Sequence, residues 1–197
     1  MISGNSFCYV GLDVVVVENI VAVVEALRTE EFGHFHGGEF CICHDHAAIG
    51  YHLRVRAEVT EIGGPVCTDS CLEFFVMTDP STGLYLNCEV NPLCVTHLAV
   101  GTGRGDRVVM RTLPAGMAMT HSDHRGRWWA VSYTLPAALL ADRLGKGPAA
   151  GLTIRGNFYK CGDATEAAHY CMFKPYNTEN PDYHRPEQFA EMRLIGE

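Results

Sequence analysis

Hydrophobic and polar residues alternate along most of this chain, which is the pattern of β-strands with one buried face. The clearest case is IGYHLRVRAEV at 49–59, where Ile49 begins an apolar row at every second position and His52 belongs to the polar row. Turn-forming sequences such as DPSTG at 79–83 and GRGD at 103–106 separate similar stretches. These stretches predict further strands at 39–44, 70–77, 84–91, 94–101, 127–134, 151–161, 168–174 and 189–195.

Two short segments have helical spacing instead. Apolar residues three and four positions apart predict a helix at 18–28, and a second helix is expected to start after Pro136 and to end before Gly145. Because strands outnumber helices, the sequence predicts an all-β fold: an antiparallel β-sandwich, jelly-roll or immunoglobulin-like, with one or two short helices. No repeat or linker sequence divides the chain, so residues 1–197 are expected to form a single domain.

Composition narrows the functional classes. The formal net charge of −8 gives no electrostatic support for a nucleic-acid partner. No apolar run is long enough for a membrane span, and the first residues lack the basic and apolar segments of a secretory signal. The nine cysteines are an odd number, so we expect reduced thiols rather than a disulfide framework, and a cytoplasmic location.

Strands 70–77 and 84–91 each have one apolar parity and one parity that mixes carboxylates, amides and aromatic rings. If the strands pair as a hairpin, Glu73, Tyr85, Glu89 and Asn91 share one face of the sheet. Such side chains suit a sugar, because carboxylates and amides bind adjacent hydroxyls and rings stack on C–H faces. The same pattern equally fits a polar sheet face that only keeps the protein soluble.

Five segments have the order and spacing found in one known family: TDSCLEFF, LYLNCEVNPL, RGNFYKCGD, AHYCMFKPY and DYHRPEQFAEMRL. Over roughly residues 40 to 195 the chain resembles the carbohydrate-binding family 9-like proteins, single-domain relatives of carbohydrate-binding module family 9. The resemblance implies a β-sandwich without catalytic activity whose partner is a saccharide. It also implies that the sugar end lies between two aromatic rings, and that structural calcium ions are possible.

Carried onto this sequence, the resemblance implies a set of hydrogen-bonding ligands. Glu73 and Asn91 fall where the family has such ligands, and Glu89 falls where it has a polar one. Asn157 and Tyr159 lie on the strand that can close the site, at one parity of 151–161.

The aromatic walls of the site are only partly present in this sequence. Tyr183 falls where one clamping ring is expected, and Phe173 stands where relatives carry tryptophan. Relatives also tend to have a tryptophan just before Asp69, whereas this chain has Val66 and Cys67 in the segment PVCTDS. One ring of the clamp is therefore absent from its usual place.

Alternatives to sugar binding remain open. Glu73 and Glu89 could be the carboxylate pair of a glycoside hydrolase, or could hold a calcium ion. We favour binding without catalysis, because a shallow sheet face desolvates a carboxylate too little to raise its pKa, and because the resembling family is non-catalytic. No catalytic residue is therefore assigned.

A haem- or metal-binding sandwich domain is a third alternative. CICHDHAAIG at 41–50 gathers cysteines and histidines, but their order lacks the usual zinc spacing, and we interpret the segment as a strand and a hairpin tip. Methionines are frequent haem ligands in related sandwiches but more often fill cores. The sequence therefore assigns no metal ligand. The methionines concerned are Met77, Met110, Met117, Met119, Met172 and Met192.

Overall fold

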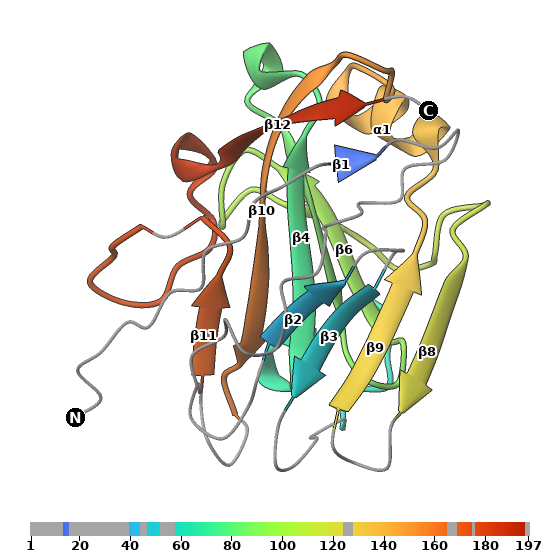
Figure 1. Ribbon diagram of the computed structural model, residues 1–197, viewed down its shortest axis with the longest axis vertical. Helices are drawn as coiled ribbons and strands as arrows, with labels where there is room; N and C mark the ends of the chain where they lie inside the picture. The colour runs from blue at the N-terminus through green and yellow to red at the C-terminus, as the bar shows by residue number, and fades with distance from the viewer. Residues whose placement is uncertain are drawn as a thin grey trace.

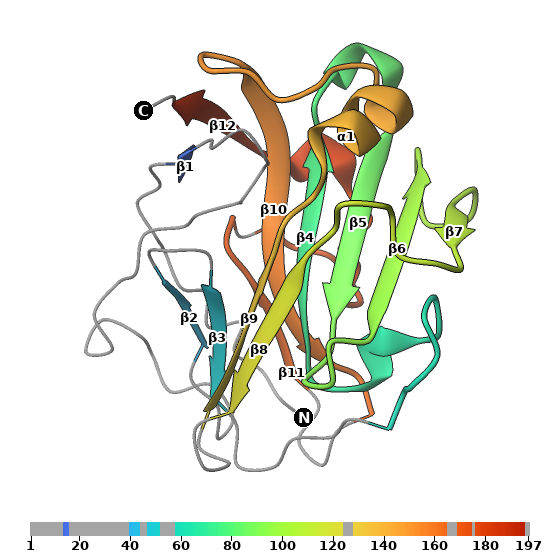
Figure 2. The same cartoon turned by 90° about the vertical axis from the view of Figure 1, so that its right-hand side faces the viewer.

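Two β-sheets lie face to face in the computed structural model, with α1 (Ala137–Leu144) at one end (Figures 1 and 2). The structure describes residues 14–15, 40–43, 47–51, 58–123, 128–164, 169–174 and 176–195. This arrangement confirms the predicted all-β sandwich. Within the described residues, no helix is long and apolar enough to cross a membrane.

The larger sheet has eight strands. In spatial order it contains β1 (Val14–Val15), β12 (Ala190–Ile195), β10 (Thr153–Gly162), β4 (Cys71–Met77), β5 (Tyr85–Val90), β6 (Thr96–Gly101) and β7 (Val108–Met110). The eighth strand, β11 (His169–Met172), pairs with the far end of β10. Every pair in this sheet is antiparallel except β1 with β12.

The smaller sheet has four antiparallel strands. Their spatial order is β2 (Phe40–Cys43), β3 (Ala47–Tyr51), β9 (Trp128–Tyr133) and β8 (Met119–Asp123). Three short 3-10 turns complete the described elements: η2 (Val66–Thr68), η3 (Pro80–Thr82) and η4 (Pro186–Gln188).

Most predicted strands occur within two residues of their predicted bounds, but the strand expected at 49–59 is wrong at its end. Residues 58 and 59 are not in a strand, because the backbone N–H groups of Glu58 and Val59 donate to the Asp69 carboxylate at 3.2 and 3.0 Å. The short strands β7 and β8 were not predicted, because neither shows a clear alternation. The helix predicted at 18–28 lies outside the described residues.

Helix α1 confirms the second predicted helix. Pro136 precedes it, and Gly145 ends it in the left-handed region (φ +91°) with its N–H donating to Ala141 O at 3.2 Å. Leu140 and Leu144 are fully buried against the sandwich interior. The start and stop signals in the sequence are therefore the ones that the structure uses.

The larger sheet is buried on both faces in its centre, where every residue of β4 and β5 is buried. On the inner face, Leu72, Phe74 and Val76 join the core between the two sheets. On the outer face a second apolar cluster forms, in which Phe75 and Tyr85 pack under the chain between Met172 and Phe189. The outer face is therefore not the open surface that alternation alone suggests.

Candidate functional site: a carboxylate pocket

The strand register places four polar side chains in one row across the outer face. Tyr159 of β10 is paired with Glu73 of β4, Glu73 with Glu89 of β5, and Glu89 with His97 of β6. Residues directly opposite one another in an antiparallel pair have neighbouring side chains on the same face. The parity argument thus predicted the meeting of Glu73 and Glu89, and it missed His97 on the next strand.

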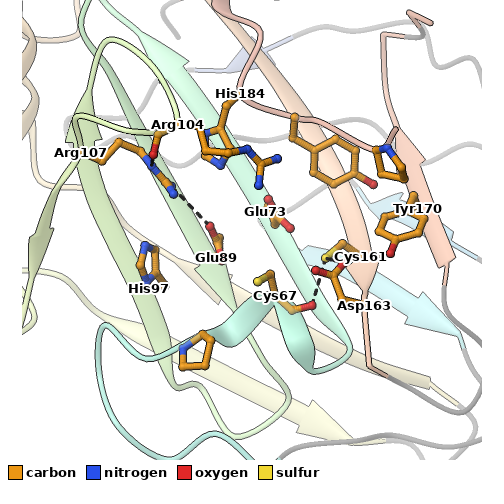
Figure 3. Close-up of a pocket in the computed structure, with 13 residues that line it drawn as sticks. Cys67, Glu73, Glu89, His97, Arg104, Arg107, Cys161, Asp163, Tyr170 and His184 are labelled. Carbon is orange, nitrogen blue, oxygen red and sulfur yellow. Dashed lines mark hydrogen bonds and ion pairs between the residues drawn. The ribbon is translucent and has the colours of Figure 1, made fainter. Parts of the chain in front are cut away.

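A pocket of about 340 Å³ lies over this row. Figure 3 shows Arg104, Arg107 and His184 on one side of the two carboxylates, and Cys161, Asp163 and Tyr170 on the other. The residues that line it are Pro65, Cys67, Glu73, Glu89, His97, Arg104, Arg107, Cys161, Asp163, Tyr170, Pro181, Tyr183 and His184.

Burial sets the protonation of the two carboxylates, since the residues Glu73 and Glu89 are each only 5% exposed. Desolvation, followed by the charge of Glu89, raises the pKa of Glu73 well above its usual range. Desolvation also raises the pKa of Glu89, but His97, Arg107 and a 3.0 Å hydrogen bond from Asn87 Nδ2 act in the opposite direction. Glu73 is therefore the carboxyl that more readily keeps a proton, and the pair can donate as well as accept.

These shifts correct one expectation. The sheet face is enclosed rather than shallow, so insufficient desolvation is no argument against catalysis by Glu73 and Glu89.

Two arginines reach the pocket from the loop between β6 and β7. Arg107 Nη1 lies 4.0 Å from Glu89 Oε1, and it is buried with no hydrogen-bond partner among the described residues. Arg104 pairs with Asp182 at 2.9 Å, which joins this loop to the segment before η4. Asp106 shapes the loop by accepting hydrogen bonds from the N–H groups of residues 102 and 103. From the sequence, this segment was interpreted only as a glycine-rich turn.

His184 forms part of the pocket wall beside the arginines. Its Nδ1 lies 2.7 Å from the Tyr85 hydroxyl, and its ring is tilted against Phe75. Burial, with the charges of Arg107 and Arg104, lowers the pKa of His184 to about 3. The imidazole is therefore neutral at physiological pH.

Thiols occupy the opposite side of the pocket. Cys67 lies in the wall, close to where the sequence lacks the expected ring, and burial raises its pKa to about 12. Cys161 Sγ donates to Cys67 O at 3.2 Å and lies 3.8 Å from Cys71 Sγ. The hydrogen bond with Cys71, followed by burial, raises the pKa of Cys161 well above its usual range, so both Cys67 and Cys161 are protonated at neutral pH.

Of the aromatic residues predicted for the site, Tyr183 lines the pocket. Its ring stacks on Tyr159 with 4.0 Å between centroids, and its hydroxyl donates to Lys160 O at 3.1 Å. Tyr170 is a second ring in the lining that sequence reasoning did not assign. Phe173 is not in the pocket, because its ring packs edge-on against Phe158, 6.2 Å away, with the core between the sheets.

Both predicted asparagines are engaged with the backbone. Asn91 Nδ2 donates to Val59 O and to Asp69 at 2.9 Å, while its Oδ1 accepts from the N–H groups of residues 93 and 95. Asn157 Oδ1 accepts from Lys174 N at 2.8 Å, and its Nδ2 donates to Lys174 O. Neither asparagine lines the pocket. The hydrogen bonds of Asn91 hold the loop after β5, and those of Asn157 hold Lys174, just after the end of β11.

The two remaining predicted residues lie next to the lining rather than in it. Tyr85 and Tyr159 are almost fully buried, and their hydroxyls bond His184 and the Tyr183 carbonyl respectively. The structure thus gathers Glu73, Glu89 and Tyr183 around the pocket, supports them with these two tyrosines, and places Asn91, Asn157 and Phe173 elsewhere.

The polar pocket on the outer face of the larger sheet is a candidate ligand-binding site of this β-sandwich. The family model for carbohydrate-binding family 9 matches residues 12–194, and the chain belongs to this family. As a member of this family it is a non-catalytic carbohydrate-binding module, so the hydrolase alternative for Glu73 and Glu89 is rejected on family membership.

Solved structures with the same fold support the architecture. A presumed carbohydrate-binding protein from Bacteroides uniformis superposes with a TM-score of 0.63 at 24% identity, over 80% of this chain and 78% of the other. A family 9 module from Caldicellulosiruptor kristjanssonii in complex with glucose gives 0.55 at 13% identity, covering 98% and 97%. The cellotriose complex of a module from the same organism gives 0.52 at 13%, covering 98% and 95%. No curated protein is significantly similar in sequence.

Proposed function

We propose that this module binds the terminal unit of a mono- or oligosaccharide in the pocket over Glu73 and Glu89 and leaves it chemically unchanged. The observation that carries the proposal is the row of Glu73, Glu89 and His97 at the floor of the pocket, with Arg107 Nη1 beside it, which has no hydrogen-bond partner in the described part of the chain. The glucose and cellotriose complexes of the structural neighbours support a saccharide as the ligand class.

The chemistry of the lining fits hydroxyl groups. Glu89 accepts hydrogen bonds from a hydroxyl, and a protonated Glu73 donates to a hydroxyl oxygen as well as accepting. Arg107 Nη1 supplies a charged donor, and no described residue accepts a hydrogen bond from it. The rings of Tyr170 and Tyr183 offer apolar surface for the C–H groups of a sugar ring.

The size of the pocket favours the end of a chain. Its volume of about 340 Å³ is near the lower limit of small-molecule sites, which run from about 300 to 1,000 Å³. Affinity should be modest, because desolvation of sugar hydroxyls offsets most of each hydrogen bond. The absent ring near Cys67 lowers it further, since stacking area is lost there.

Isothermal titration calorimetry with glucose, cellobiose and cellotriose tests the proposal. The variant Glu89→Gln keeps the shape of the side chain but loses the charged acceptor, so we expect its Kd to rise by roughly 10- to 100-fold. The matched control is Glu191→Gln, the same change at an exposed position on β12, which should bind like the wild type.

Two results would contradict the proposal. One is a folded wild type that binds none of these sugars at millimolar concentration. The other is an unchanged Kd in Glu89→Gln. Chromatography of the sugar after the titration should show that it is chemically unchanged. Repeating the titration with and without calcium tests the structural calcium ions that the resemblance predicts.

A further inference from the structure

Cysteine and carboxylate donors meet at the side of the pocket that lies away from the arginines. Cys71 Sγ, Cys161 Sγ and a Glu73 carboxylate oxygen all lie within 4.8 Å of one another, and all three residues are buried. The fold enforces this meeting, because Cys71 and Cys161 are direct partners in the β4–β10 register and Glu73 is the next residue on the same face of β4.

The distances between these donors match the edges of a zinc tetrahedron. Two thiolates at 2.3 Å from a tetrahedral zinc ion are about 3.8 Å apart, and a thiolate and a carboxylate oxygen are about 3.5 Å apart. Cys71 Sγ lies 3.8 Å from Cys161 Sγ, and it lies 3.5 Å from Glu73 Oε1. Two edges therefore have the required length without any backbone movement.

A fourth donor stands at the mouth of the site. Asp163 Oδ1 lies 3.6 Å from Cys161 Sγ, the length of a sulfur–oxygen edge, but it is not one of the three donors that all lie within 4.8 Å of one another. The Asp163 side chain must therefore turn inward to complete the site. Asp163 is exposed and lines the pocket, so an ion can reach the buried donors from solvent. Lys160 Nζ donates to Cys161 O at 2.8 Å, so a positive charge lies near the site. Two thiolates and two carboxylates carry more negative charge than one divalent ion neutralises, and Lys160 offsets part of the difference.

We propose that Cys71, Cys161, Glu73 and Asp163 form a binding site for a soft divalent cation of the zinc class in the side of the pocket. Thiolates select zinc and its soft analogues over calcium and magnesium, which prefer sites made only of oxygen. The site differs in donors from the calcium ions predicted from the resemblance. It does not depend on sugar binding, although Glu73 is common to both.

The test is a cobalt titration of the reduced protein in metal-free buffer, followed by visible and near-ultraviolet absorption. We expect thiolate-to-cobalt charge-transfer absorption and tetrahedral d–d bands that saturate at one ion per chain and vanish when zinc is added. Cys161→Ser should strongly reduce the charge-transfer absorption, because one of the two thiolates is lost, and Cys71→Ser should reduce it in the same way. Asp163→Asn, a change at an exposed position, should leave the fold intact and weaken cobalt binding about 10-fold or more.

Cys88→Ser is the matched control, because Cys88 is equally buried but belongs to the core between the sheets. It should keep the full cobalt spectrum. The proposal is overturned if the wild type shows no thiolate–cobalt absorption, or if that absorption survives unchanged in Cys161→Ser and Asp163→Asn. Since the readout is an absorption band of the metal alone, a failure of the sugar titration would leave this result unaffected.

Discussion

His184 should make the stability of the protein depend on pH between about 6.5 and 3, and replacing it by glutamine should remove that dependence. Its imidazole is held neutral in the pocket wall, because burial and the two neighbouring arginines lower its pKa to about 3. In the unfolded chain the same group titrates near 6.5. The unfolded state therefore binds the extra proton over this range, and the folded state does not.

The sign and size follow from proton linkage. Above about pH 6.5 the imidazole is neutral in both states, so the lowered pKa of the folded state does not change the free energy of unfolding. Below about pH 6.5 only the unfolded chain takes up the proton, so the free energy of unfolding falls as the pH falls. With a folded pKa near 3, the loss at pH 5 is about 2 kcal/mol relative to pH 7. Because the ring is only partly buried, solvent screening reduces this figure, and we expect about 1 to 2 kcal/mol.

Urea denaturation of the wild type and of His184→Gln at pH 7 and pH 5 measures the effect. Other histidines and the buried carboxylates also titrate, so the informative quantity is the difference between the two proteins at each pH. The wild type should lose about 1 to 2 kcal/mol more than the variant between pH 7 and pH 5. Parallel losses in both proteins would refute the reasoning and show that His184 is not held neutral.

Three further substitutions test the packing around the site. Gly156→Ala should lower the free energy of unfolding, measured by chemical denaturation, by at least about 3 kcal/mol. The reason is that a Cβ at this position meets the Phe75 carbonyl and comes within 2.7 Å of the Met192 methyl group. Gly105→Ala is the control, because a Cβ there meets nothing within 4 Å. Asn91→Ala should cost about 2 to 4 kcal/mol in chemical denaturation, because it leaves four hydrogen bonds unmade, yet the Kd for a sugar should not change. Arg104→Ala should cost less than about 1 kcal/mol in the same assay, since this ion pair is exposed, and a larger loss would contradict that assignment.

Alternation of side chains was enough to predict the strands and the meeting of Glu73 and Glu89. Both depend on a period of two, which a single sequence shows directly. The enclosure of the outer face could not be predicted in this way. It results from the chain around Tyr183 folding back over Phe75, a contact between segments about a hundred residues apart, and no local pattern reports such a contact.

Residue type alone was a poor guide to what a polar side chain binds. Asn91 and Asn157 have the chemistry of sugar ligands, but their amides satisfy nearby backbone groups instead. Met172, the last residue of β11, belongs to the outer cluster, whereas the next residue, Phe173, packs against the core between the sheets. The residue type of Phe173 does not show on which face it lies. Arg107 was not predicted as a site residue, because the sequence of its loop was interpreted only as a glycine-rich turn.

Strands β4 and β5 are buried at every position, with the core on one face and the pocket floor on the other. Changes of ligand preference made on these strands must therefore preserve two packing environments at once, which restricts both natural variation and laboratory redesign. The loop from Arg104 to Arg107 carries no such double constraint, because it borders the pocket and the residues from Arg104 to Asp106 are exposed. A library aimed at new sugars should randomise this loop and leave untouched both the floor and the segment around Tyr183, which packs over Phe75.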